Sequence, residues 1–136
     1  MNMRNKGFTL VELMLVVIII GVLIAMVAPR LAGRSEQAKI AAARADIQAN
    51  LASALDVYEI DNSAYPDKLE DLMVKPTGAS RWKGPYLKRK PIDPWGNPYV
   101  YKYPGTHGDY DLISYGKSGV EGGGNEITSW SEETEK

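Results

Sequence analysis

The feature that most constrains this chain is a continuous apolar run near its N-terminus, from Phe8 to Ala28, with a single charged residue, Glu12. At about 1.5 Å per helical residue, such a run reaches roughly 30 Å, the thickness of the hydrocarbon core of a bilayer. Arg4 and Lys6 precede the run, and no acidic residue does. Since cytoplasmic flanks are enriched in Lys and Arg, the pattern predicts a single-pass segment with a cytoplasmic N-terminus.

A cleaved secretory signal peptide is the main alternative for this run. Its apolar region is usually shorter, and its cleavage site follows closely as a pair of small residues. Leu23 and Met26 occupy the positions where the first small residue would be needed. A carboxylate inside the run also argues against this alternative, although a plain signal anchor stays open.

Glu12 predicts a specific ionic partner. A carboxylate in hydrocarbon costs a few kcal/mol on insertion scales, about 2.5–3.5, so it normally has a partner or a function. The α-amino group of Phe8 would be such a partner if the chain were cut after Gly7, a residue small enough for close approach of a protease. The alternative is that Glu12 lies near the interface and snorkels or is protonated.

Helical character continues beyond the apolar run, to about Asp61. Pro29 predicts a kink because proline lacks an N–H and crowds the preceding turn; a fresh helix start at Ser35 is the alternative. An apolar stripe recurs with three-to-four spacing opposite a polar face, which indicates an amphipathic helix. The stripe consists of Ile40, Ile47, Leu51, Leu55 and Tyr58.

So long a helix exceeds what the rest of the chain can cover. Its apolar half must therefore be buried by lipid or by other copies of the same chain. A contact between Glu12 and a neighbour's N-terminus joins two different surfaces, so it propagates head to tail and builds a filament. The sequence thus predicts a homopolymer.

The remaining residues predict a small α+β domain. A short helix is expected at 68–73, a tight turn at 93–98, and strands at 99–103 and 110–115 joined by a Gly-containing turn. The two strands would form an antiparallel hairpin packed on the helix. The predicted organisation is a leader at 1–7, a transmembrane and polymerisation helix at 8–28, its amphipathic continuation at 29–62, and a domain at 63–136.

Composition excludes several functions. Cysteine is absent and His107 is the only histidine, so disulfides and Cys- or His-based metal sites are excluded. The 16 Lys and Arg residues nearly balance 17 Asp and Glu residues, which argues against a nucleic-acid partner. Asp109 and Asp111 would share a strand face, but turn and strand-end roles are favoured over catalysis. His107 is expected to be solvated, and the Trp and Tyr residues to fill a small core rather than bind a ligand.

The run from Lys6 through Gly7, Phe8 and Glu12 resembles the class III signal of type IV pilins and type II secretion pseudopilins. The resemblance implies that a prepilin peptidase cuts between Gly7 and Phe8 and N-methylates Phe8. It also implies that Glu12 meets the Phe8 ammonium of a neighbouring subunit during assembly, and that the fold is pilin-like.

Further matches lie along nearly the whole chain and resemble the major pseudopilin of type II secretion: GPYL, DPWGNPY, GDYDLISYG and an EGG…I..W ending. The family implies a structural subunit of a periplasmic pseudopilus that drives protein export across the outer membrane, and not an enzyme. Implied partners are minor pseudopilins and the secretion platform of the inner membrane, in which the unassembled chain would be anchored with its C-terminal domain in the periplasm. The open alternatives are a type IV pilin, a minor pseudopilin, or a signal-anchored periplasmic binding module.

The same resemblance implies a calcium site in the loop after the second strand. It would place the ligands at the carbonyls of Tyr115 and Val120 and the side chains of Ser118 and Glu126. Ser118 stands where the family has its first acid, and Glu126 replaces an aspartate. The alternative is a loop that has lost the metal and is held by its own hydrogen bonds.

Overall fold

The computed structural model describes residues 7–131, without the side chains of 30–32. Arg4 and Lys6, on which the predicted membrane orientation rests, lie outside the described residues. The chain divides into two compact units, Met1–Gln37 and Ala38–Lys136, and each is described by itself.

Helical residues run unbroken from Leu10 to Asn62. The α-helix α1 (Leu10–Ala45) contains Pro29, a π-helical segment η1 (Asp46–Leu51) follows, and α2 (Ala52–Asn62) completes the run. The predicted continuation of the helix is confirmed, and a fresh start at Ser35 is wrong. The helix ends where expected: Ser63 caps α2 in the left-handed conformation, with φ of 63°.

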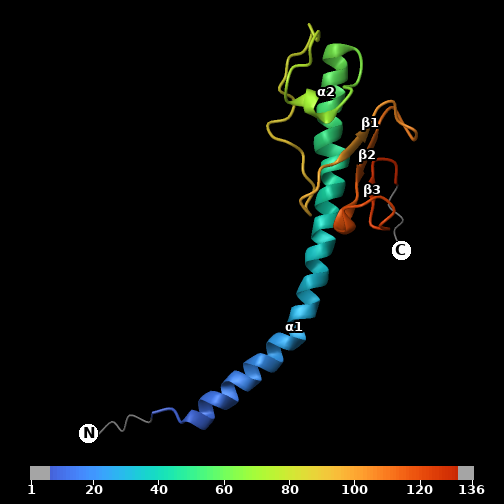
Figure 1. Cartoon of the computed structure of the whole chain (residues 1–136). Helices are drawn as coiled ribbons and strands as arrows, with labels where there is room; N and C mark the ends of the chain where they lie inside the picture. Colours follow the sequence, from blue (N-terminus) through green and yellow to red (C-terminus); the bar gives the residue numbers. More distant parts are fainter. Residues whose placement is uncertain (1–6, 132–136) are drawn as a thin grey trace. The chain divides into compact units, whose positions relative to one another are not determined.

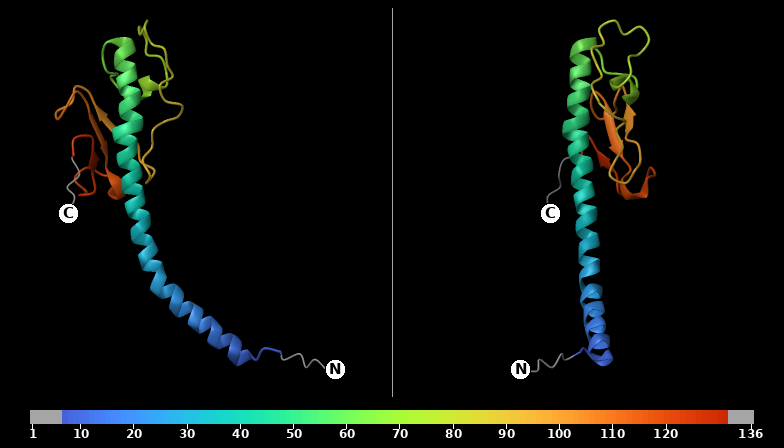
Figure 2. Two further views of the ribbon diagram at one scale, coloured as in Figure 1. Left: turned by 180° about the vertical axis from the view of Figure 1, so that it is seen from behind. Right: turned by 90° about the vertical axis from the view of Figure 1, so that its left-hand side faces the viewer.

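In the second unit, the helix and a small sheet enclose the core. The sheet has the order β1-β2-β3 and is antiparallel throughout, with β1 at Val100–Lys102, β2 at Asp111–Ser114 and β3 at Ile127–Thr128. Figure 1 shows the strands running beside the helix, and Figure 2 shows the same packing from two further sides. The predicted hairpin is confirmed by the pairing of Tyr101 with Leu112, whereas β3 was not predicted.

The core joins the predicted stripe to the sheet. Ile47, Leu51, Leu55 and Tyr58 are buried as expected, and Ile40 packs against them at the edge. Leu72 comes from the short 3-10 helix η2 (Leu69–Leu72), and Leu112 from β2; both are completely buried. Aromatic rings surround this core, so their expected role in filling it is confirmed: Tyr65, Trp82, Tyr86, Trp95, Tyr101 and Tyr110 pack against it.

The turn at 93–98 fixes one end of the sheet. Asp93 is buried, and its Oδ1 accepts N–H bonds from Trp95 and Asn97 at 3.1 and 2.8 Å. Its Oδ2 accepts the hydroxyl of Ser114 at 2.7 Å. Ser114 Oγ in turn accepts the N–H of Gly116 at 3.1 Å. One carboxylate therefore joins the turn before β1 to the residue that starts the loop after β2.

Candidate assembly site and C-terminal loop

The helix of the first unit is apolar, and its side chains are not buried within that unit. It is long and apolar enough to cross a membrane, and its most apolar stretch has a mean hydropathy of 3.1 and is 0% buried. Large side chains from Phe8 at 85% exposure to Val27 at 50% face outward. Such a surface is stable only against lipid or other protein.

Glu12 lies at the start of this helix and forms a capping box with Thr9. The Thr9 N–H donates to Glu12 Oε2 at 3.0 Å, and the Glu12 N–H donates to Thr9 Oγ1 at 3.2 Å. The Thr9 hydroxyl also donates to Glu12 Oε2 at 3.1 Å. A threonine followed three residues later by glutamate is the sequence signal for this arrangement. We did not predict it, because Glu12 was considered only as a membrane charge.

Gly7 and Phe8 precede the helix and are exposed. The predicted cleavage position is therefore accessible, and Glu12, a few residues further along the chain, is hydrogen bonded to Thr9. The α-helix continues through Pro29. The kink itself stays a prediction.

The predicted calcium residues do lie in one loop. Ser118 ends the 3-10 helix η3 (Gly116–Ser118), and its hydroxyl lies 2.9 Å from the Tyr115 carbonyl oxygen and 3.3 Å from that of Val120. Glu126 Oε1 accepts the Gly124 N–H at 3.4 Å. Backbone N–H groups, its own first and then those of the neighbouring glycines, lower the pKa of Glu126. Glu126 is the only carboxylate among the four predicted ligand residues.

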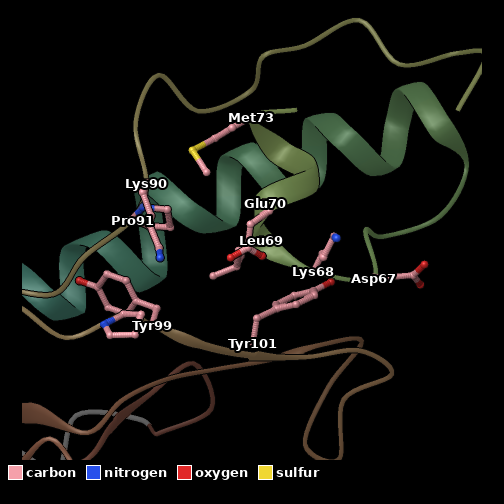
Figure 3. Close-up of a pocket in the computed structure, with 10 residues that line it drawn as sticks. Asp67, Lys68, Leu69, Glu70, Met73, Lys90, Pro91, Tyr99 and Tyr101 are labelled. Carbon is pink, nitrogen blue, oxygen red and sulfur yellow. The ribbon is translucent and has the colours of Figure 1, made fainter. Parts of the chain in front are cut away.

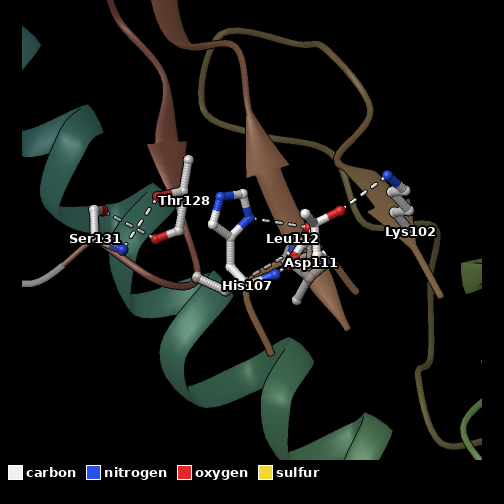
Figure 4. A network of polar contacts seen from close by, with 8 residues as sticks. Lys102, His107, Asp111, Leu112, Thr128 and Ser131 are labelled. Atoms are coloured by element: carbon white, nitrogen blue, oxygen red, sulfur yellow. Dashed lines mark hydrogen bonds and ion pairs between the residues drawn. The ribbon is translucent and has the colours of Figure 1, made fainter. Parts of the chain in front are cut away.

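The aspartate pair at the hairpin does not form a paired-carboxylate site. Asp109 is exposed, whereas Asp111 is buried and its carboxylate accepts the N–H groups of Thr106 and His107 at 2.9 and 3.1 Å. Figure 4 shows His107 beside the Asp111 carboxylate. Burial alone would raise the pKa of Asp111, but the two backbone donors and the His107 ring outweigh it and lower the pKa. Asp111 thus holds the hairpin turn, as its expected turn and strand-end role requires.

His107 is exposed in its loop, as expected, but its ring also makes two contacts that were not predicted. Its Nδ1 lies 3.2 Å from Asp111 Oδ2, and its ring stacks on Trp130 with centroids 3.8 Å apart and planes 5° apart. This stack holds the segment after β3 against the hairpin turn. Sequence could not show the contact, because His107 and Trp130 are separated by two strands.

A shallow pocket lies between η2 and the residues around β1, and Figure 3 shows its lining. Its two tyrosine hydroxyls already serve the fold: that of Tyr99 donates to Asp46 Oδ2 at 3.0 Å and that of Tyr101 to the Pro66 carbonyl at 2.8 Å. Burial raises the pKa of both hydroxyls. The pocket therefore offers no free acid–base pair among these tyrosines.

Two family models match successive parts of the chain. Residues 30–130 match the family model "Type II secretion system (T2SS), protein G", and residues 2–28 match "Prokaryotic N-terminal methylation motif". The type II secretion system core protein G of Pseudomonas aeruginosa is 49% identical, over 93% of this chain and 96% of that protein. The Escherichia coli K12 protein of the same name is 47% identical, over 93% and 92%.

A solved structure has the same fold. The crystal structure of the major pseudopilin from the type 2 secretion system of enterohaemorrhagic Escherichia coli superposes with a TM-score of 0.65 at 35% identity. The match covers 75% of this chain and 95% of that one. The predicted resemblance and the α+β pilin-like fold are confirmed.

Proposed function

Because the chain belongs to the type II secretion system protein G family, we propose that it is the major structural subunit of a pseudopilus that polymerises through its N-terminal helix. The observation that carries the proposal is the helix surface from Leu10 to Val27, which is exposed and, apart from Glu12, apolar. In the membrane this surface contacts lipid. In the filament it contacts the same helix of neighbouring subunits.

Processing would precede assembly. A prepilin peptidase would cut between Gly7 and Phe8 and methylate the new amino group, and the match to a methylation motif over residues 2–28 supports this step. The exposed, non-helical Gly7 and Phe8 suit a protease, which needs an extended and accessible backbone. The mass of the membrane-extracted chain tests the step: the expected mass lacks residues 1–7 and includes one methyl group, whereas the full-length mass would contradict it.

Assembly would use the charge of Glu12. In the single chain this carboxylate is satisfied by Thr9, at 3.0 and 3.1 Å. These partners are neutral, so the carboxylate keeps its charge for the ammonium of a neighbour's Phe8, and charge-assisted hydrogen bonds are about twice as strong as neutral ones. The contact joins unlike surfaces and therefore extends without closing.

The subunit would be anchored in the inner membrane with its N-terminus in the cytoplasm and the unit from Ala38 in the periplasm. Minor pseudopilins, the inner-membrane secretion platform and copies of itself are the proposed partners. Its role in moving exported proteins across the outer membrane would be mechanical rather than catalytic. The apolar helix and the family membership support the anchor, and the family's structural role supports the absence of catalysis.

Two substitutions separate charge pairing from helix capping. Glu12→Gln keeps an oxygen acceptor for the Thr9 N–H but loses the charge, and Thr9→Ala keeps the charge but loses the capping hydroxyl. We expect Glu12→Gln to abolish sheared filaments in cells that produce the rest of the secretion machinery, and Thr9→Ala to retain them. Normal filaments from Glu12→Gln would refute the charge pair, and filaments lacking this chain would refute the major-subunit role.

A further inference from the structure

The loop from Tyr115 to Glu126 is built on a rigid base. Asp93 and Ser114 hold its second residue, Gly116, through the Gly116 N–H, as described above. Gly116 has φ of 62°, and a Cβ there would overlap the Asn125 carbonyl. The two ends of the loop therefore touch at Gly116 and Asn125. These contacts fix the conformation of the loop at its base, independently of the groups in its middle.

The Ser118 hydroxyl closes the middle of the loop. Its oxygen lies 2.9 Å from the Tyr115 carbonyl oxygen and 3.3 Å from that of Val120, so its single proton is shared between two acceptors on either side of it in the chain. Gly123 packs against the same hydroxyl so closely that a Cβ would overlap Oγ. The hydroxyl therefore links three segments of the loop. These two carbonyls are the backbone ligands that the resemblance would give to calcium.

Other donors in the loop are used in the same way. The Asn125 side-chain amide donates to the Gly123 carbonyl at 3.0 Å. The Gly123 N–H donates to the Val120 carbonyl at 3.3 Å. The Glu126 carboxylate accepts the Gly124 N–H. Carbonyl and carboxylate oxygens that a cation would need are thus already paired with donors of the loop itself.

The charge of the loop also disfavours a divalent cation. Calcium takes six to eight oxygen ligands, commonly including several carboxylates. Within the part of the chain that the structure describes, no three Asp, Glu or His side chains gather in a way that could hold a metal. Lys117, exposed beside Ser118, adds a positive charge. The loop holds two glutamates, Glu121 and Glu126, and only Glu126 stands at a predicted ligand position.

We propose that this loop closes without calcium, because the Ser118 hydroxyl and the loop's own donors replace the metal. The neutral serine at position 118 is the reason: an acid there would remove the hydroxyl donor that the Tyr115 and Val120 carbonyls share, and would bring a negative charge toward both carbonyl oxygens. The inference concerns the folded subunit and does not depend on the proposed polymerisation.

Thermal unfolding of the whole chain in detergent, followed by tryptophan fluorescence, tests the proposal without requiring filaments. The wild type and three variants, Ser118→Ala, Ser118→Asp and Ser118→Asn, are compared in EGTA, millimolar calcium and millimolar magnesium. The Asn variant matches the Asp variant in shape but lacks its charge.

We expect the wild-type Tm to be the same in EGTA and calcium, and the Ala variant to unfold several degrees lower in both. The Asp variant should unfold lower in EGTA and be raised by calcium but not by magnesium, and the Asn variant should not respond. A wild-type Tm that rises with calcium and not with magnesium would overturn the proposal. So would an Ala variant as stable as the wild type, or an Asp variant indifferent to calcium.

Discussion

The two units of this chain differ in how the side chains of the helix are buried. From Leu10 to Val27 the large side chains are exposed, and the polar contacts described there serve the helix start. From Ala43 onward the helix buries its stripe against a sheet, with Leu55 and Leu112 fully covered. The second unit therefore contains its own stabilising contacts. The first unit depends on contacts with its surroundings, whether lipid or neighbouring copies, to cover its apolar side chains.

A pair of identical substitutions should give the largest contrast. Leu112→Ala removes a fully buried side chain, so we expect it to lower the free energy of unfolding by about 2–5 kcal/mol. Leu13→Ala in the first unit removes a side chain that is 60% exposed, and should leave that free energy unchanged. Denaturant unfolding in detergent measures both, because Trp82, Trp95 and Trp130 all lie in the second unit. Equal losses from the two variants would break the comparison.

Asp93→Ala should give the next largest effect. It removes the acceptor for two half-buried N–H groups and one buried hydroxyl, and a buried donor left unsatisfied costs about 1–3 kcal/mol. The half-buried N–H groups can be hydrated, so we expect a total loss of about 3 kcal/mol. Asp67→Ala, at an exposed aspartate, is the control. A loss no greater than that of the control would show that the turn at 93–98 does not fix the sheet.

Thr9→Ala should affect only the first unit. Loss of an N-cap side chain costs about 1 kcal/mol of helix stability. Amide exchange at Leu10, Val11 and Glu12 in detergent should accelerate, while exchange in β2 stays unchanged. Thr9→Ser, which keeps the hydroxyl, should restore slow exchange. Unchanged exchange in the Ala variant would mean that the capping box contributes nothing.

The smallest expected effect is a pH dependence from Asp111. The pKa of this carboxyl is lower in the folded chain than its ordinary value, so its stabilisation is complete above the unfolded pKa of about 3.9. Stabilisation is lost as the pH falls from there through the folded pKa. Asp111→Asn should therefore flatten the dependence of Tm on pH below about pH 4, whereas Asn at the exposed Asp109 should leave the dependence intact. If the Tm of Asp111→Asn depended on pH as the wild-type Tm does, the stabilising role of the Asp111 carboxylate would be contradicted.

Local sequence patterns by themselves determined most of the helix and the hairpin of this protein. The apolar run, the helical stripe, the alternating strands and the Asn-Ser-containing helix end are all periodic or local signals, and each was found where predicted. Glu12 was singled out because a lone carboxylate in an apolar run is costly wherever it lies. Its bond to Thr9 was also encoded locally, although we did not predict it.

Tertiary structure alone decided three features. The two-residue strand β3 has no periodicity to detect and exists because β2 offers it a free edge. The stack of His107 on Trp130 joins residues that only folding brings together. In the C-terminal loop, sequence placed Ser118 and Glu126 near one another. Only the folded loop shows the Ser118 hydroxyl between two carbonyls, because hydrogen-bond partners are chosen by distance in space and not by position in the chain.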